Sequence, residues 1–127
     1  MRTIVFTDRA PRPVGPYSQA IVEGGFVFVS GQGPLNPGLG KYEPSDVRAE
    51  TRQTLENIRA ILEEAGSSLD NVVKVNVYLR DIRDFAAMNE VYASFFREAA
   101  PARTTIQAGA LPLGISVEID CIARAGA

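Results

Sequence analysis

The chain has 127 residues, of which 46% are hydrophobic, a size and composition that suit a single domain with one core. Thirteen Lys and Arg residues against fifteen Asp and Glu residues give a net charge of −2 and no basic footprint for a phosphate backbone, so nucleic acid is not an expected partner. The chain has no histidine and one cysteine, which excludes His-based triads, zinc sites built on histidine or several cysteines, and iron–sulfur clusters.

No run of residues approaches the roughly 20 apolar positions of a membrane span. The apolar run at residues 4–6 is too short for a secretion leader. We therefore expect one domain over residues 1–127, soluble and cytoplasmic, that works without a metal or a cofactor. Catalysis would depend on Asp, Glu, Lys, Arg, Tyr, Ser, Thr or backbone groups.

The first part of the chain predicts short strands over residues 2–7, 17–22 and 26–31. The second and third of these are joined by Glu23-Gly24-Gly25, and two adjacent glycines between β-branched and aromatic runs are typical of a hairpin turn. Residues 31–45 begin with many glycines and prolines, which indicates a loop.

A helix is expected next, with Ser45 as its N-cap and Gly66 as the residue that follows its end. Asp46 and Glu50 place acidic side chains near its start, where the helix dipole favours them. Its apolar positions repeat every three or four residues, at Leu55, Ile58, Leu62 and Ala65.

The second part of the chain predicts a half-buried strand over 71–80, a helix capped by Asp84 that ends before Pro101, and closing strands over 103–109 and 115–124. The second helix has an apolar stripe of Phe85, Met88, Tyr92, Phe95 and Phe96. In the last strand, apolar side chains at odd-numbered positions alternate with a set that includes Ser116, Glu118 and Asp120.

This order of elements predicts an α/β (α+β) fold, a single mixed sheet with both helices on one face. The other face of the sheet would then be bare, and it would carry Lys74, Asn76, Glu118 and Asp120 among apolar neighbours. Such a face is either hydrated or packed on another subunit, and we favour an oligomer.

Local patterns that could carry chemistry are GPYSQA at 15–20, SGQGPLNP at 30–37, PARTTIQ at 101–107 and VEIDCIA at 117–123. Each alone has a plain structural interpretation. The glycine-rich loop lacks the Lys-Ser/Thr of a phosphate loop, Arg103 is compatible with a surface ion pair, and Glu118 with a solvent-facing strand position.

Taken together, and with RQTLENIRAIL, VVKVNVYLRD and DFAAMNEVY between them, these patterns resemble the Rid family (reactive intermediate deaminases, also called the YjgF family) from about Ala10 to Ala123. The resemblance implies a chorismate-mutase-like subunit in a homotrimer, with active sites at the subunit interfaces. It also implies hydrolysis of small anionic 2-imino acids, the enamine and imine products of serine and threonine dehydration, to 2-oxo acids and ammonia.

The resemblance assigns roles to particular residues. Arg103 matches the arginine that holds the substrate carboxylate, and Glu118 matches the acidic residue that positions the attacking water. The remaining positions of the pocket are Tyr17, Ser30, Gly31, Asn89 and Thr105. Thr105 stands where deaminating members commonly have cysteine, and the segment before Pro101 is a few residues shorter than the family pattern.

The chemistry of these residues agrees with the assignment. A guanidinium forms a planar fork that matches a carboxylate bidentately. A protonated imine is already electrophilic, so its hydrolysis needs only a placed water and a carboxylate whose pKa is raised by burial. Because Arg103 opens one closing strand and Glu118 projects from the other, we expect both to reach one cleft.

Other functions remain open at this point. Within the same family they are an endoribonuclease, a non-catalytic ligand-binding or chaperone-like trimer, and a deaminase with other substrates, such as the aminoacrylate-type intermediates of pyrimidine breakdown. An acidic chain without histidine gives weak support to RNA cleavage. Binding of an anion alone would need the arginine but not the glutamate.

Overall fold

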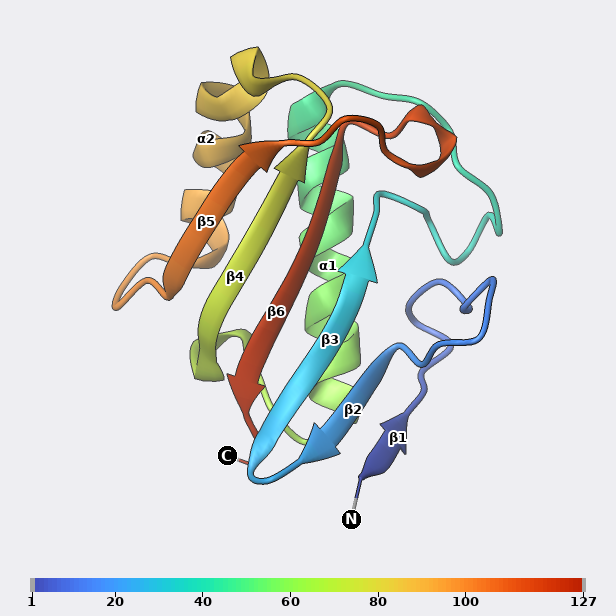
Figure 1. The fold of residues 1–127 in the computed structure, drawn as a ribbon, viewed down its shortest axis with the longest axis vertical. Coiled ribbons are helices and arrows are strands. Elements are labelled where there is room, and N and C mark those ends of the chain that lie inside the picture. The colour runs from blue at the N-terminus through green and yellow to red at the C-terminus, as the bar shows by residue number, and fades with distance from the viewer. Residues whose placement is uncertain (1, 127) are drawn as a thin grey trace.

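The computed structural model describes residues 2–126, which form one six-stranded mixed sheet with two α-helices on one face (Figure 1). The strands are β1 (Thr3–Val5), β2 (Ala20–Glu23), β3 (Phe26–Gln32), β4 (Val72–Leu79), β5 (Ala102–Gln107) and β6 (Val117–Arg124). The helices are α1 (Val47–Glu64) and α2 (Phe85–Phe95), and the short 3-10 turns are η1 (Leu69–Asn71), η2 (Ile82–Asp84) and η3 (Pro112–Gly114). The strand order is β1-β2-β3-β6-β4-β5, with β4 and β5 parallel and the other pairs antiparallel. The predicted single mixed sheet with both helices on one face is confirmed.

The core lies between the sheet and the helices. Alternate residues of the central strands point toward the helices and are fully buried against the apolar stripe of α1: Val75, Val77 and Leu79 from β4, Val117 and Ile119 from β6, and Leu55, Ile58, Ile61 and Leu62 from α1. No helix within residues 2–126 is long and apolar enough to cross a membrane.

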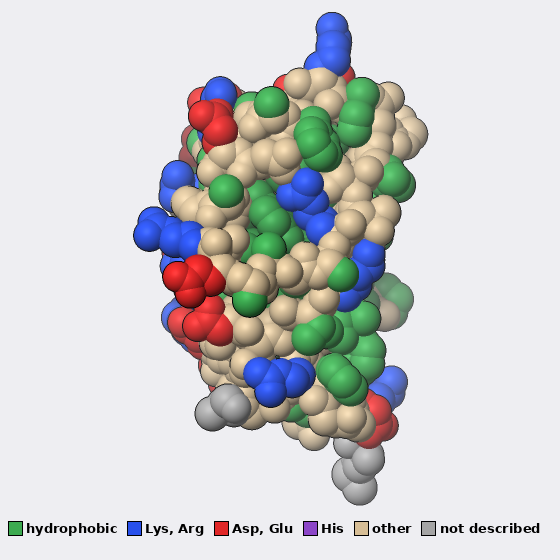
Figure 2. Space-filling model, turned by 90° about the vertical axis from the view of Figure 1, so that its left-hand side faces the viewer, with side chains coloured by type: hydrophobic (Ala, Val, Ile, Leu, Met, Phe, Trp, Pro, Cys, Tyr) green, Lys and Arg blue, Asp and Glu red, His purple; other side chains and the backbone are tan. Residues whose placement is uncertain are grey.

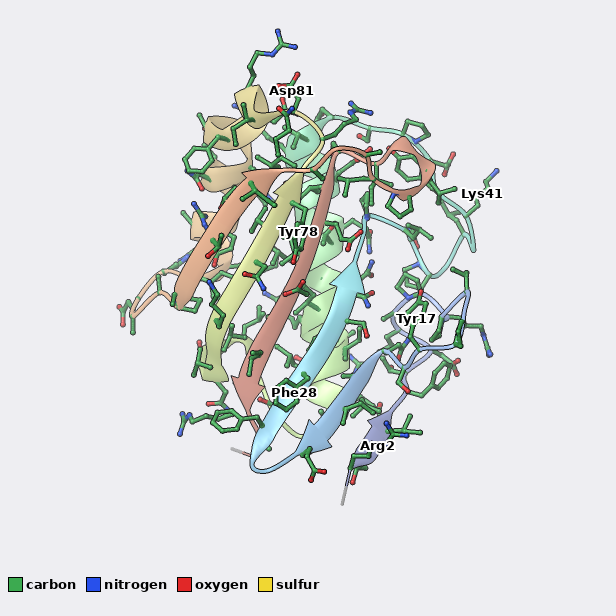
Figure 3. All side chains as sticks on the ribbon, viewed as in Figure 1. Arg2, Tyr17, Phe28, Lys41, Tyr78 and Asp81 are labelled. Atoms are coloured by element: carbon green, nitrogen blue, oxygen red, sulfur yellow. The ribbon has the colours of Figure 1, made fainter. Side chains whose placement is uncertain are left out.

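The intervening residues of the same strands form what we call the open face, the side of the sheet that no helix covers. Register places Phe26, Phe28, Lys74, Asn76, Tyr78, Thr104, Ile106, Glu118, Asp120 and Ile122 on it. Figure 3 shows Phe28 and Tyr78 on this face, on the side of the sheet away from α1. Phe28 and Ile106 remain 44% and 47% exposed there, so the open face carries uncovered apolar surface.

Two local predictions are confirmed in detail. Gly24 and Gly25 form the two-residue turn between β2 and β3, with φ angles of 62° and 85° as a type I′ turn requires. At the end of α1, the amide of Gly66 donates to the carbonyl of Glu63 and that of Ser67 to Leu62, a Schellman motif with φ of 78° at the glycine.

The predicted N-cap of α1 is wrong, whereas that of α2 is confirmed in position but not in its hydrogen bond. Asp46 caps α1, because its Oδ1 accepts from the amide of Ala49 at 2.9 Å, while the amide of Ser45 donates elsewhere. Asp84 stands at the N-cap position of α2, but its side chain makes no cap bond there. The turn η2, which precedes α2, is capped by the side chain of Asp81. Several strand ends also differ: β1 is shorter than predicted, β2 starts at Ala20 and β6 at Val117.

Candidate active site

The predicted site residues fall into two groups on opposite faces of the sheet. Glu118 is paired with Tyr78 and therefore lies on the open face, whereas Arg103 is paired with Val75 and therefore lies on the helix-covered face. Directly paired residues of neighbouring strands project to the same side of a sheet. The expectation that both groups reach one cleft is thus wrong for a single chain.

The first group, which we call the acidic half-site, consists of Tyr17, Ser30, Gly31 and Glu118. All four line one cavity of about 430 Å³, together with Arg12, Gln19, Gln32 and apolar residues that include Val14, Leu35, Leu113 and Ile115. Figure 3 shows Tyr17 in the loop beside β2 and β3, far across the molecule from β5 and α2.

A β-bulge shapes the acidic half-site. Val29 is paired with Cys121 and Gln32 with Ile119, so Ser30 and Gly31 together oppose one residue of β6. A Cβ atom on Gly31 would overlap with the Glu118 carboxylate, so only glycine lets that carboxylate lie against the backbone of β3. The hydroxyl of Ser30 donates to the carbonyl of Ser18 at 2.6 Å and so fixes the segment that carries Tyr17.

The Glu118 carboxylate has no hydrogen-bond donor among residues 2–126. Burial, and secondarily the charge of Asp120, raises the pKa of Glu118 above its ordinary value. Asp120 itself is engaged, because it accepts from Asn76 Nδ2 and from the Tyr78 hydroxyl, both at 2.9 Å. A carboxylate without a donor and with a raised pKa is a stronger base than an ordinary one, and it is therefore suited to accept a proton from water.

The second group, the basic half-site, consists of Asn89, Arg103 and Thr105. The guanidinium of Arg103 lies 4.6 Å from the ring centroid of Tyr92 and 5.5 Å from that of Phe85, both on α2. No carboxylate within residues 2–126 forms an ion pair with it. Figure 2 views this side of the molecule and shows basic and hydrophobic side chains around a hollow.

Three buried polar atoms of this region lack a hydrogen-bond partner in the described part of the chain: Asn89 Oδ1, Thr105 Oγ1 and the Tyr92 hydroxyl. Buried polar atoms are almost always satisfied, so their clustering on α2 and β5 around an unpaired guanidinium indicates that polar atoms of a ligand or of water complete the region. Burial raises the pKa of Tyr92 to about 12, so its hydroxyl stays protonated.

Sequence reasoning missed residues that shape the site. Tyr92 was expected only as part of an apolar stripe, yet its ring supports Arg103. Gln19 is 1% exposed; its Nε2 donates to the carbonyls of Thr7 and Pro11, both at 3.0 Å, and its Oε1 accepts from the amide of Thr7 at 2.8 Å. Asn57 of α1 likewise donates to the carbonyls of Gly33 and Leu35 in the cavity wall. For Gln19 and Asn57, the sequence contains no signal beyond a polar residue beside an apolar run.

Residues 2–126 offer neither a cluster of metal ligands nor a reactive cysteine. No group of three or more His, Cys, Asp or Glu side chains lies close enough there to hold a metal ion. Burial raises the pKa of the Cys121 thiol to about 12, so this buried sulfur is not a nucleophile near neutral pH.

Comparison with known proteins identifies the family of the chain. The family model described as Endoribonuclease L-PSP matches residues 7–125. A RutC family protein of Pyrococcus horikoshii is 52% identical over 123 residues, which cover 97% of this chain and 98% of that protein. The structure of YyfA of the Rid protein family from Yersinia pestis has a TM-score of 0.95 at 40% identity and covers 98% of this chain and 99% of its own. E. coli TdcF, solved with bound serine, has a TM-score of 0.91 at 42% identity, with 96% and 98% covered. The chain therefore belongs to the Rid family.

Proposed function

We propose that the protein hydrolyses 2-imino acids to 2-oxo acids and ammonia at sites shared between two copies of the chain. The observation that carries the proposal is the separation of Arg103 from Glu118 by the sheet. Each half-site is incomplete alone, since one has an anion-binding group without an anion and the other a carboxylate without a donor. If the basic half-site of one chain faces the acidic half-site of the next, the combined site has both a group that binds the substrate carboxylate and a group that accepts a proton.

The reaction follows from the two groups. Arg103 binds the carboxylate of the 2-imino acid through two parallel hydrogen bonds, and Asn89 and Thr105 offer their unpartnered oxygens to the rest of the substrate. Glu118 takes a proton from water as the oxygen bonds to the protonated imine carbon. The proton then passes from Glu118 to the amino nitrogen of the tetrahedral intermediate. As the C–N bond breaks and ammonia leaves, Glu118 takes the hydroxyl proton of the intermediate, and the C=O bond of the 2-oxo acid forms.

A closed ring is the simplest assembly that joins unlike half-sites. When one surface of a chain binds a different surface of its copy, the contact is heterologous, and it repeats until the ring closes. We propose three chains, as the family resemblance implies. The uncovered apolar residues of the open face, such as Phe28 and Ile106, support its burial in this ring.

The relatives support the substrate class. TdcF of E. coli was solved with serine, an amino acid with the carboxylate and nitrogen that a 2-imino acid also carries. The family description names an endoribonuclease, and RNA cleavage is therefore the second candidate. The cytoplasmic location expected from the sequence stays a prediction.

The direct test is an assay with freshly generated 2-iminopropanoate and 2-iminobutanoate, with release of ammonia and 2-oxo acid followed above the spontaneous rate. The same preparation is incubated with single-stranded RNA in parallel. We expect acceleration of imine hydrolysis and no RNA cleavage. Cleavage of RNA without imine hydrolysis would replace this proposal with the second candidate. The absence of both activities would favour a binding protein.

A further inference from the structure

One buried carboxylate has no part in the site described so far. Glu50 lies in the first turn of α1 and is 2% exposed. Its Oε1 accepts from the amide and the hydroxyl of Ser116, at 3.0 and 2.6 Å. Its Oε2 accepts from the Tyr42 hydroxyl at 2.7 Å and from the Ser45 amide at 2.8 Å. Four donors therefore converge on a single side chain, two from the loop just before α1 and two from Ser116, far along the chain.

These hydrogen bonds keep Glu50 charged in the interior. Burial by itself would raise the pKa of Glu50, but the hydrogen bonds from Ser116, Tyr42 and Ser45 together hold it below its ordinary value. A buried charge is tolerated only when such partners satisfy it. The network is thus complete, and loss of the carboxylate would leave buried donors without an acceptor.

The network fixes the chain segment that leads to Glu118 in the acidic half-site. Ser116 stands immediately before β6 and two residues before Glu118. Strict alternation would put both side chains on the open face, as the sequence predicted, but the chain bends at Ser116. Ser116 consequently turns toward α1 and is 3% exposed, while Glu118 projects into the cavity.

A second anchor acts on the same segment. The amide of Arg80 donates to the carbonyl of Ser116 at 3.0 Å, and its Nη1 donates to the carbonyl of Gly114 at 2.6 Å. Within η3, next to the anchored carbonyl of Gly114, Leu113 has a φ of 60°, a conformation that non-glycine residues adopt only where their surroundings impose it. Leu113 and Glu118 line the same cavity, so the anchored segment forms one of its walls.

We infer that Glu50 is a positioning residue that fixes the segment from Gly114 to Glu118 and thereby the carboxylate that accepts the proton. The inference deepens the proposed function and rests on it for its catalytic part. Glu50 acts through Ser116 and does not itself line the acidic half-site. Its loss should therefore impair the work of Glu118 and leave substrate binding by Arg103 intact.

The kinetic test uses variants of the whole protein. Glu50→Ala should lower kcat roughly ten- to hundredfold, the effect of misplacing a catalytic group by about 1 Å. Affinity for an unreactive 2-oxo acid should not change. Glu50→Gln keeps one acceptor oxygen for Ser116 and should retain most of kcat. Ser116→Ala, which removes only the hydroxyl donor, provides a milder variant if Glu50→Ala fails to fold.

A matched control separates positioning from stability. Asn71 is also a buried polar anchor, whose Nδ2 donates to the carbonyl of Gly126 at 2.6 Å, but it does not line the acidic half-site. Asn71→Ala should lower the melting temperature without changing kcat. In a Glu118→Gln background, Glu50→Ala should lower kcat no further, because the group it positions is already gone. A loss that multiplies with that of Glu118→Gln would overturn the inference.

A second measurement is independent of activity. The side-chain carboxyl carbon of Glu118 can be titrated by NMR. The ionisable groups around it are Asp120 and Tyr78 on the open face and Tyr17 and Arg12 in the same cavity, and all variants keep them. We expect the midpoint to lie above 4.5, the ordinary value, and to fall toward it in Glu50→Ala and Ser116→Ala as water enters. Shifted midpoints in a protein that does not hydrolyse imines would reject the proposed function but not the positioning of Glu118 by Glu50. Unshifted midpoints with wild-type kcat would reject the positioning role.

Discussion

Arg103 and Glu118 lie on opposite faces of the sheet, although the strands that carry them, β5 and β6, are both paired with β4. A change of side-chain rotamer cannot join them, because the sheet stands between the two groups. If both act on one substrate, a second chain has to supply one of them. The predictions below test this relationship and its chemical consequences.

The geometry of Arg103 should matter as much as its charge. In Arg103→Lys, a mobile point charge replaces the two-pronged hydrogen bond to the carboxylate. We expect kcat/KM to fall about ten- to hundredfold, the equivalent of one hydrogen bond to a charged group. Arg97→Lys, at an exposed position after α2, is the control and should behave as wild type. Nearly full activity in Arg103→Lys would show that Arg103 does not bind the substrate and only packs against the ring of Tyr92.

Glu118→Gln should separate chemistry from binding. The amide keeps the shape of the carboxylate but cannot accept a proton, and general-base assistance typically contributes about a hundredfold to ten-thousandfold. We expect kcat to fall within that range in single-turnover experiments, while affinity for a 2-oxo acid is kept. If the variant loses 2-oxo acid binding as well, Glu118 maintains the structure of the pocket and does not act by positioning the water.

The raised pKa of Glu118 also predicts how stability depends on pH. Because the folded chain binds this proton more tightly than the unfolded chain, ionisation of Glu118 lowers stability as pH rises from its ordinary value of 4.5 through the raised value. Glu118→Gln should thus gain stability relative to wild type at neutral pH and lose that gain below pH 4.5. Urea unfolding at both pH values measures this, with exposed Glu64→Gln as control. A difference that does not change with pH would contradict it.

The open face should be required for assembly. Phe28→Asp puts a charge on this face, which is unfavourable if a neighbouring chain covers it (Figure 3). Light scattering should give about three times the 13.7 kDa chain mass for wild type and a smaller mass for the variant, with unchanged circular dichroism. Leu39→Asp, in the exposed loop after β3, tests whether any added charge has this effect. A monomeric wild type that hydrolyses imines would remove the shared-site account.

Local sequence signals predicted much of the fold. The two glycines of the β2–β3 turn and Gly66 after α1 act through their own backbone angles, so neighbouring residues suffice to recognise them. The burial of α1 followed from its apolar spacing. The N-cap of α1 differed because Ser45 and Asp46 are both good candidates, and only the geometry of the preceding loop decides between them.

The site was harder to predict because its geometry depends on distant pairings. The side to which Arg103 points is set by its register with Val75, which the pattern of β5 alone does not reveal. Ser116 broke its expected alternation because a bend turns it toward Glu50. Glu50 was expected as a favourable charge at a helix start, and the donor that ties it to the site, Ser116, lies far away in the sequence.

The most direct test of the shared site is complementation between two inactive variants. Arg103→Ala and Glu118→Gln are purified separately, mixed in equal amounts, dissociated in denaturant and reassembled. In a ring where each site combines Arg103 of one chain with Glu118 of the next, every mixed trimer contains one intact site, so the mixture should recover about a quarter of the wild-type kcat. Either variant reassembled alone should stay inactive. Failure of the mixture to recover activity, although mass spectrometry shows mixed trimers, would contradict a site shared between chains.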